Sequence, residues 1–417
     1  MSKYSTLIYK LPKSTDNILV HDADLELSHG IEYPKFSLGF QHYIHQSKDK
    51  INIFSDFKDK KKVYLVLNKF EKIVDDYDKS IDIEAKKYFN LKSDFGIIGR
   101  SFYKFWEILM SFNLSLENKP ITTAHIADRG TSLQAISCYR NLFAKNNKDD
   151  KHYVLSMNKL DHMLATDSEL EEHYKKDKSS KIIQINSKDE IFDEKSIKDK
   201  IDLIMAYTGY GWTNKNVQEQ EAHRLLLNEI IIALKIQNKG GNFICKIYES
   251  YTKTTLKLIS ILLSTYENVY IIKPFMSRLY NSEKFLVCMN FTGANNKEIE
   301  KLETVLQTLL DNNNKSKKIA QIFPKFKLDD IIKDTFIKLN TEISNNQFIN
   351  INEIMDFLNK QNYRGDVYHQ RKDMQINASE FWISRFFNNN QNNIIDENNK
   401  IIANNEILIK QLTKSIN

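Results

Sequence analysis

A lysine interrupts one of the most apolar stretches of the chain. The segment GGNFICKIYES (residues 240–250) has the pattern of a buried β-strand, and Lys246 places an ammonium group near its carboxyl end. A lysine held among other charges can accept or steer the proton of an attacking hydroxyl group. The alternative is a structural lysine whose stem lies along apolar surface while its charge reaches the rim. Lys246 by itself does not separate these two interpretations.

The elements around Lys246 predict its surroundings. From about residue 120, short apolar runs alternate with helical stretches, which predicts a parallel, doubly wound, Rossmann-like α/β sheet with helices on both faces. Ligands of such sheets bind at the carboxyl ends of the strands, where Lys246 should lie. The last two strands are too close in sequence for a crossover helix, so the last should run antiparallel to its neighbour. The predicted strands are residues 121–128, 152–157, 181–186, 201–207, 241–249, 268–274 and 284–291.

Helices are predicted between and around these strands. One begins near Gly99, and a long amphipathic helix should end at Gly240-Gly241, the usual place for glycine after a helix. Other helices are expected at residues 131–143, 254–266, 296–312, 328–343 and 349–361.

The chain therefore divides into three predicted regions. Residues 1–97 form an N-terminal extension with a short sheet of its own. Residues 98–293 form the α/β domain. Residues 294–417 form a helical appendage that ends in an Asn-rich tail, mobile at least in part.

Composition restricts the function class only loosely. The net charge of +6 permits a polyanionic partner without requiring one. Cys138, Cys245 and Cys288 are widely spaced, so we expect reduced core cysteines in the cytoplasm rather than a disulfide framework or a metal site. No run approaches 18 apolar residues, which predicts a protein without a membrane span.

A longer pattern surrounds Lys246. The segments GGNFICKIYES and IIKPFMSRLYNSEKFLVCMNF share a Gly-Gly…Lys…Lys-Pro…Ser-Arg…Ser-Glu series, and RSFYKFWEIL precedes them. This series resembles the FtsJ-type RNA 2′-O-ribose methyltransferases, in particular the cap-specific branch found in eukaryotes and large DNA viruses. The resemblance covers roughly residues 98–292.

The resemblance implies a chemistry and its residues. The family uses a Lys-Asp-Lys-Glu tetrad to methylate a ribose 2′-hydroxyl with S-adenosylmethionine, and Lys104, Lys246 and Glu283 match its two lysines and its glutamate. Arg278, in the Ser-Arg pair, could orient Glu283 or contact an RNA phosphate.

Two parts of the family pattern are altered. The tetrad aspartate should follow strand 201–207, where Tyr207 or Thr208 stands instead; Asp202 should lie at the opposite end of that strand. The cofactor loop keeps Asp128 and Gly130, but Arg129 replaces a small residue and could either pair with the cofactor carboxylate or fill the pocket.

Three further residues are candidates for ligand contacts. Asp189 follows the third strand, where a family aspartate commonly faces the adenine amine; an ordinary loop cap is the equal alternative. Tyr210 and Trp212 could stack on an RNA base or a cap guanine, with loop packing as the alternative.

Two functions remain open at this point. The first is an S-adenosylmethionine-dependent RNA 2′-O-ribose methyltransferase acting on the mRNA cap. The second is a methyltransferase-fold subunit that no longer methylates and serves as an RNA-binding protein or scaffold, for example within a capping or transcription complex. We favour the first, because lost activity would normally relax the places held by Lys104, Lys246 and Glu283. A viral origin, with a location in the host cytoplasm or the virion, is an expectation by analogy only.

Overall fold

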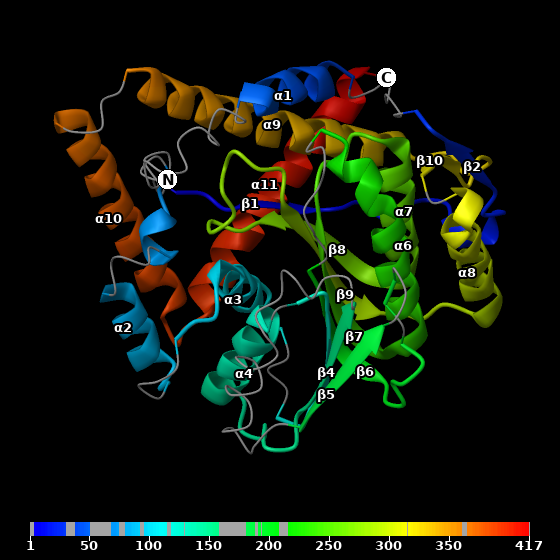
Figure 1. Ribbon diagram of the computed structural model, residues 1–417, viewed down its shortest axis with the longest axis horizontal. Coiled ribbons are helices and arrows are strands. Elements are labelled where there is room, and N and C mark those ends of the chain that lie inside the picture. The colour runs from blue at the N-terminus through cyan, green and yellow to red at the C-terminus, as the bar shows by residue number, and fades with distance from the viewer. Residues whose placement is uncertain are drawn as a thin grey trace.

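A mixed eight-stranded sheet forms the centre of the molecule (Figure 1). This computed structural model describes residues 4–30, 38–50, 68–74, 80–91, 96–114, 118–128, 130–157, 181–187, 191–192, 194–207, 216–314, 316–360 and 365–416. The main-sheet strands are β1 (Leu7–Lys10), β3 (Thr122–Ile126), β4 (Lys151–Met157), β5 (Lys181–Ser187), β6 (Ile201–Ala206), β7 (Gln237–Ile247), β8 (Tyr266–Lys273) and β9 (Lys284–Phe291).

The strand order is β1-β8-β9-β7-β6-β3-β4-β5. Strands β3 to β7 run parallel, so their carboxyl ends meet at one edge. Strand β9 lies between β7 and β8 and runs antiparallel to both, which confirms the predicted reversal of the last strand. All seven predicted strands are present, and the α/β fold class is confirmed.

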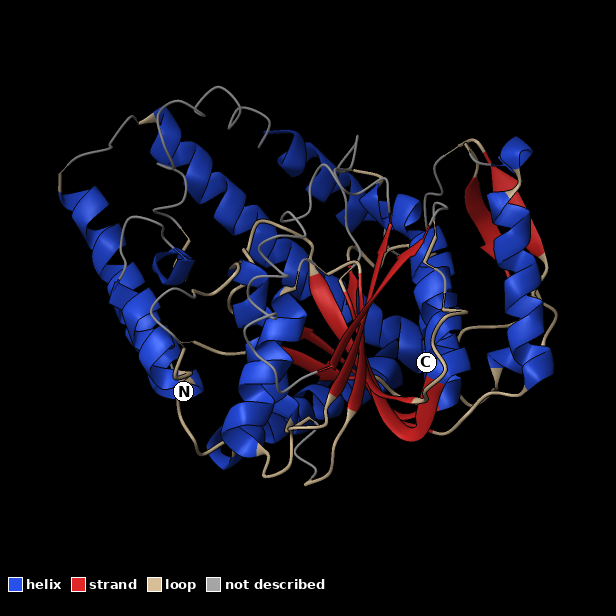
Figure 2. Ribbon diagram, turned by 60° about the horizontal axis from the view of Figure 1, so that its bottom comes forward, coloured by secondary structure: helices blue, strands red, loops and turns tan. Residues whose placement is uncertain are grey.

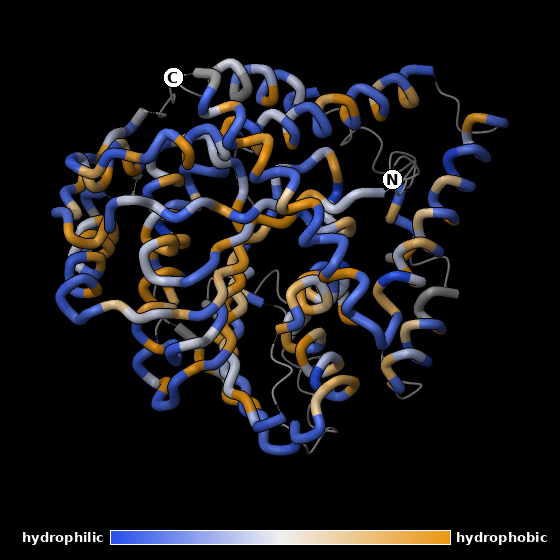
Figure 3. Tube along the Cα trace, turned by 180° about the vertical axis from the view of Figure 1, so that it is seen from behind, coloured by the Kyte–Doolittle hydropathy of each residue, from blue (hydrophilic) through white to orange (hydrophobic). Residues whose placement is uncertain are grey.

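Helices cover both faces of the sheet. On one face lie α3 (Arg100–Phe112) and α4 (Thr131–Phe143), and on the other α6 (Gln218–Ile236) and α7 (Lys253–Thr265) (Figure 1). Apolar residues are concentrated along the sheet and on the helix faces against it (Figure 3). Successive strand residues point to opposite faces, so Ile244 of β7 packs on the α3 side while Phe243 and Cys245 pack on the α6 side. Lys246 has the parity of Ile244 and therefore faces α3.

The two short N-terminal strands pair with strands from the second half of the chain. Strand β1 pairs antiparallel with β8 at the edge of the main sheet. Strand β2 (Leu25–Ser28) pairs with β10 (Lys318–Ile322) in a separate two-stranded sheet (Figure 2). Among its described residues, the N-terminal extension therefore does not form the short sheet of its own that the sequence predicted. Each of its described strands pairs instead with a strand far along the chain.

The remaining helices surround this core. Helix α9 crosses above the sheet with α1 beside it, and α11 lies close to β1 and α3 (Figure 1). No helix among the described residues has the length and apolar character that a membrane span needs. These elements are α1 (Leu38–Lys50), α2 (Ser80–Tyr88), α8 (Asn296–Leu310), α9 (Asp330–Asn359), α10 (Asp366–Phe386), α11 (Asn392–Ile416) and the short 3-10 helices η1 (Ile18–Val20), η4 (Glu71–Val74) and η6 (Asn312–Asn314).

Two sequence expectations about helices are wrong. Helix α6 ends at Ile236, and Gly240-Gly241 lie inside β7, where a Cβ at Gly241 would meet the Asp202 carbonyl oxygen at 3.0 Å. The two helices predicted at 328–343 and 349–361 form one helix, α9, because nothing between them breaks the backbone pattern. The Asn-rich tail forms α11, which buries isoleucines at helical spacing: Ile394, Ile402 and Ile409.

Candidate active site

Three separate elements bring charged side chains together at the carboxyl edge of the sheet. Lys104 lies on α3, Lys246 lies near the end of β7, and Glu283 directly precedes β9. All three are buried, with exposed fractions of 4%, 7% and 7%. The structure therefore brings together the three residues that the family pattern selected.

Glu283 is the centre of this group. Its Oε1 lies 2.6 Å from Lys104 Nζ and accepts a 2.6 Å hydrogen bond from Ser277 Oγ. Burial by itself would raise the pKa of Glu283, but the charges of Lys104 and Lys246 outweigh it and hold the pKa well below its usual range. The Glu283 charge in turn outweighs desolvation at Lys104 and raises the pKa of that ammonium. Glu283 is thus held as a carboxylate and Lys104 as an ammonium.

Tyr207 occupies the place where the family has an aspartate. Its hydroxyl accepts a 3.1 Å hydrogen bond from Lys104 Nζ and donates one of 3.2 Å to Glu283 Oε2. Lys246 Nζ lies over its ring, 3.7 Å from the centroid. Asp202 lies at the far end of β6, as predicted, and accepts hydrogen bonds from Thr122 N and Asn238 Nδ2.

Lys273 anchors the backbone of Glu283. Its Nζ donates to the backbone carbonyls of Asn281 and Glu283, at 2.8 Å each, and to Asn281 Oδ1 at 3.1 Å. Burial lowers the pKa of Lys273 to about 7, although the nearby Glu283 charge opposes the shift. Through these hydrogen bonds Lys273 holds the end of the 281–283 turn.

A buried glutamate fixes the loop that carries Ser277. Glu107, one helical turn from Lys104 on α3, accepts hydrogen bonds from Phe275 N at 2.7 Å, Met276 N at 3.0 Å and Trp382 Nε1 at 2.9 Å. Burial raises its pKa to about 7, against the opposing effect of these donors. Since Trp382 belongs to α10, the C-terminal helices contribute to the support of the site loop.

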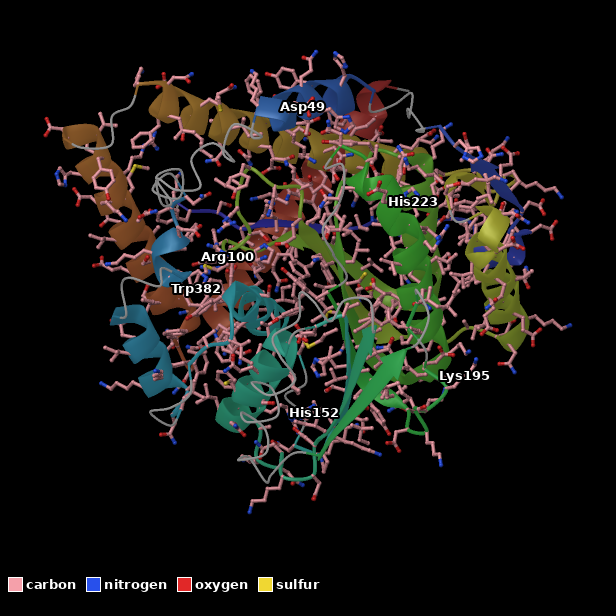
Figure 4. The ribbon with its side chains drawn as sticks, viewed as in Figure 1. Asp49, Arg100, His152, Lys195, His223 and Trp382 are labelled. Carbon is pink, nitrogen blue, oxygen red and sulfur yellow. The ribbon has the colours of Figure 1, made fainter. Side chains whose placement is uncertain are left out.

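Arg278 contacts a different carboxylate from the one expected. It pairs with Glu71 of η4 through NH2 at 2.9 Å, and Arg100 pairs with the same Glu71. Arg100 NH1 also donates to the Met276 carbonyl at 3.2 Å. Figure 4 shows Arg100 on the same side of the molecule as Trp382. Ser277, and not Arg278, therefore orients Glu283; an RNA contact for Arg278 stays a prediction.

Two residues of the loop after β3 have left-handed backbone conformations. Ala127 and Gly130 have φ values of 55° and 86°, and Gly130 precedes the first residue of α4. Asp128 is buried and both of its oxygens are engaged: Oδ1 accepts from Thr131 Oγ1 at 2.6 Å, and Oδ2 accepts from Ser132 N and Oγ at 2.7 Å. Asp128 thus caps α4 and shapes the loop.

The histidine beside this loop has hydrogen-bond partners at both ring nitrogens. His125 is fully buried, and its ring nitrogens lie 2.7 Å from Ser132 Oγ and from Thr123 Oγ1. Burial lowers its pKa well below the usual range. It supports the loop as a neutral core residue.

Several predicted contacts fall outside the described residues. These are Arg129, Asp189, Tyr210 and Trp212, together with Thr208. Among the residues that the structure does describe, no group of three or more His, Cys, Asp or Glu side chains could hold a metal ion.

Sequence reasoning missed four residues that build this site. Tyr207 stands out in the sequence only because it is not the aspartate of the family pattern, and Lys273 only as part of the Lys-Pro pair. Glu107 resembles any charged residue on a surface helix, and Glu71 lies in a segment without a recognisable pattern. An acidic residue on the same helix face as buried aromatics was the one available signal for Glu107.

Comparison with known proteins identifies the family that the sequence resembles. The family model for FtsJ-like methyltransferases matches residues 98–291. Residues 98–291 are therefore similar to the FtsJ-like methyltransferases, over just under half of the chain. The match includes Lys104, Lys246 and Glu283, so the resemblance seen in the sequence is confirmed at the level of the family.

The curated relatives that resemble this chain include named cap methyltransferases. It is 27% identical over 162 residues to cap-specific mRNA (nucleoside-2′-O-)-methyltransferase 1 of Trypanosoma cruzi, covering 38% of this chain and 44% of that protein. The Dictyostelium discoideum protein of the same name is 32% identical over 114 residues, covering 27% of this chain and 15% of that protein. A Caenorhabditis briggsae relative is named inactive cap-specific mRNA (nucleoside-2′-O-)-methyltransferase 1B. It is 27% identical over 215 residues, covering 51% of this chain and 23% of that protein. The chain spans less than half the length of each of these relatives.

Solved structures are more distant. A ribosomal RNA methyltransferase structure from Plasmodium falciparum has 22% sequence identity and a TM-score of 0.35, covering 47% of this chain and 99% of that one. A likeness this low supports no argument about function.

Proposed function

We propose that this FtsJ-like chain transfers a methyl group from S-adenosylmethionine to a ribose 2′-hydroxyl of RNA, and that its substrate is the cap region of mRNA. The observation that carries the proposal is the convergence of Lys104, Lys246 and Glu283 at the carboxyl edge of the sheet, where α/β sheets bind ligands. The names of the curated relatives support the cap as the substrate.

The residues present suit this reaction. S-adenosylmethionine, when bound, supplies the methyl group that the ribose oxygen acquires. A ribose hydroxyl is a poor nucleophile, so its oxygen must be held in line with the methyl carbon and its proton must leave. Lys246 Nζ accepts that proton as a neutral amine or, as an ammonium, steers the hydroxyl by donating a hydrogen bond to its oxygen. The Lys104–Glu283 pair fixes the charge around it. Positioning of this kind can contribute roughly 7–11 kcal/mol to catalysis.

The loop after β3 fits the cofactor through its backbone. Gly130 has no side chain at the N-terminal end of α4, so a ligand can approach the backbone closely there. The Asp128 carboxylate is occupied within the protein, so its support for the cofactor is through the loop that it shapes. Cofactor contacts of Arg129 and Asp189, and RNA contacts of Tyr210 and Trp212, belong to the proposal.

The test begins with binding and continues with transfer. Calorimetry with S-adenosylmethionine and S-adenosylhomocysteine measures whether the cofactor binds. Transfer of a radiolabelled methyl group to capped and uncapped RNA of the same sequence then measures activity. Resistance of one internucleotide linkage to alkali identifies 2′-O-methylation, because cleavage of RNA by base requires a free 2′-hydroxyl.

Lys246→Ala is the decisive variant, and Lys239→Ala is its matched control. Lys239 lies on the same strand but is exposed at the opposite end. Lys246→Ala should abolish transfer while RNA affinity stays within about threefold, whereas Lys239→Ala should behave as the wild type. Equal transfer by Lys246→Ala refutes the catalytic assignment. A folded wild-type chain that binds no cofactor at millimolar concentration favours the RNA-binding or scaffold subunit instead.

The cellular setting belongs to the proposal as well. Cys138, Cys245 and Cys288 are buried and form no disulfide with one another, which supports the proposal of a cytoplasmic location. A partner subunit in a capping or transcription complex, and a viral origin, stay predictions.

A further inference from the structure

Strand register places Tyr207 beside Lys246. Strands β6 and β7 run parallel, with Ala206 paired to Cys245, so Tyr207 is the next residue along from that pair and lies across from Lys246. Neighbouring residues in register on adjacent strands point to the same face of a sheet. The Tyr207 backbone N–H donates to the Ile126 carbonyl at 3.0 Å, which continues the sheet pairing to this residue.

The Tyr207 ring is held in one place. Phe105 of α3 meets it edge-on at a centroid distance of 5.6 Å, and Phe285 of β9 lies 6.1 Å away with its plane tilted by 23°. Lys246 Nζ lies 3.7 Å from the ring centroid, well within the ~6 Å over which an ammonium is attracted to an aromatic face.

The Tyr207 hydroxyl reaches the other two charged groups. It accepts from Lys104 Nζ at 3.1 Å and donates to Glu283 Oε2 at 3.2 Å, and these two are themselves joined at 2.6 Å. One side chain thus contacts every member of the group.

Charge balance explains why this contact matters. Lys104 and Lys246 are two ammonium groups, and both act on the single carboxylate of Glu283. An aspartate in the place of Tyr207 would supply a second negative charge. The electron-rich face of an aromatic ring offers a partial negative counterpart without a formal charge.

We propose that Tyr207 is the positioning residue of this site: its ring face holds the Lys246 ammonium, and its hydroxyl joins Lys104 to Glu283. This inference rests on the proposed methyl transfer for its kinetic consequence. The arrangement that it describes can be tested without any turnover.

The kinetic test compares Tyr207→Phe with Tyr207→Leu. Phenylalanine keeps the ring and loses only the hydroxyl, whereas leucine loses both. We expect kcat on capped RNA to fall by less than about tenfold for Tyr207→Phe and by about a hundredfold or more for Tyr207→Leu. KM for RNA and the Kd for S-adenosylmethionine should stay near wild-type values, since Tyr207 acts through Lys246. Thermal unfolding of each variant checks that the fold is retained.

A spectroscopic test measures the contact itself. In protein labelled with 13C only at lysine, the ring current of Tyr207 should displace the ε-methylene proton resonances of Lys246 upfield. Lys246→Met assigns the resonance by its loss. The displacement should persist in Tyr207→Phe and vanish in Tyr207→Leu, while the resonance of exposed Lys239 stays unchanged in both variants.

The outcomes separate this inference from the proposed function. Failure of the wild type to methylate RNA refutes the proposed function. The displaced Lys246 resonance would then still show whether the Lys246 side chain lies over the Tyr207 ring. Absence of a displaced resonance overturns the inference even if the chain is active. Equal kcat for the wild type and Tyr207→Leu overturns it as well, and a loss in Tyr207→Phe as large as in Tyr207→Leu overturns the role of the ring face.

Discussion

Glu107→Gln tests whether the buried carboxylate on α3 supports the site loop. Glu107 accepts three hydrogen bonds, from Phe275 N, Met276 N and Trp382 Nε1, with its two oxygens. A glutamine has one acceptor oxygen, and its NH2 group only donates. At least one of the three buried donors therefore faces another donor, which costs roughly 1–3 kcal/mol.

The kinetic consequence follows from the path of the loop. A displaced backbone at 275–276 moves Ser277, whose hydroxyl holds Glu283 at 2.6 Å. We expect kcat to fall about tenfold or more in Glu107→Gln, because each ~1.4 kcal/mol lost from alignment in the transition state reduces the rate tenfold. Cofactor affinity should stay near the wild-type value, since Glu107 binds the 275–276 backbone and α10.

Stability against pH provides a second, independent measurement. Burial raises the pKa of Glu107 from 4.5 to about 7 in the folded protein, so the folded state binds an extra proton between these values. Its contribution to the free energy of unfolding is complete below about pH 4.5 and is lost as the pH rises to about 7. A shift of that size corresponds to about 3 kcal/mol. Glutamine does not titrate, so Glu107→Gln should not show this decrease in the free energy of unfolding between about pH 4.5 and pH 7.

Urea denaturation from pH 4.5 to pH 8 measures the difference in slope. Glu300→Gln is the matched control, since Glu300 is an exposed helical glutamate. The reasoning is refuted if the wild type and Glu107→Gln lose stability in parallel across this range, or if kcat is the same for both.

Two further substitutions test the site's charge and its loop. Lys104→Met leaves Glu283 buried without its ion-pair partner and should destabilise the fold by about 3–5 kcal/mol near neutral pH. The lysine charges depress the pKa of Glu283, so the contribution of Glu283 to the free energy of unfolding is present above about pH 4.5 and is lost as the pH falls further. Lys104→Met should therefore lose less stability on acidification than the wild type. Equal losses in the two proteins would contradict this assignment. Gly130→Ala places a Cβ on a backbone with φ of 86°, and it should cost about 1–2 kcal/mol in thermal unfolding and weaken cofactor binding. Gly39→Ala, at a helical glycine with open space around it, should cost nothing, and equal effects of the two would show that the loop conformation is not special.

The parts of the fold with a strong apolar pattern were predictable. Strands β3 to β9 stand out as short apolar runs, and the buried strand around Lys246 led directly to the site edge. Strand β1 has only four residues, and its pairing with β8 depends on contacts that no local pattern records. Strand β10 was missed for the same reason. The division at residues 97 and 293 stays a prediction.

The candidate site was predictable as far as residue type and spacing allow. Lys104, Lys246 and Glu283 were selected because they match the tetrad of the FtsJ-type family, and the structure brings them together. The role of Tyr207 depends on the register of β6 against β7, which the sequence does not specify. Glu107 was equally hidden, because its three donors come from segments 168 or more residues away.

Pairing between the first strands and much later ones has a consequence for synthesis. Leu7 of β1 pairs with Lys273 of β8, and Leu25 of β2 pairs with Ile322 of β10. A ribosome adds roughly 5–20 residues per second, so the earliest strands emerge long before their partners exist. During that interval β1 and β2 remain without their sheet partners. Once β8 has formed, its outer edge has unpaired backbone N–H and C=O groups that can pair with another extended chain until β1 occupies that edge. Yield of soluble protein should therefore depend on the speed of translation and on chaperones that hold the amino-terminal segment.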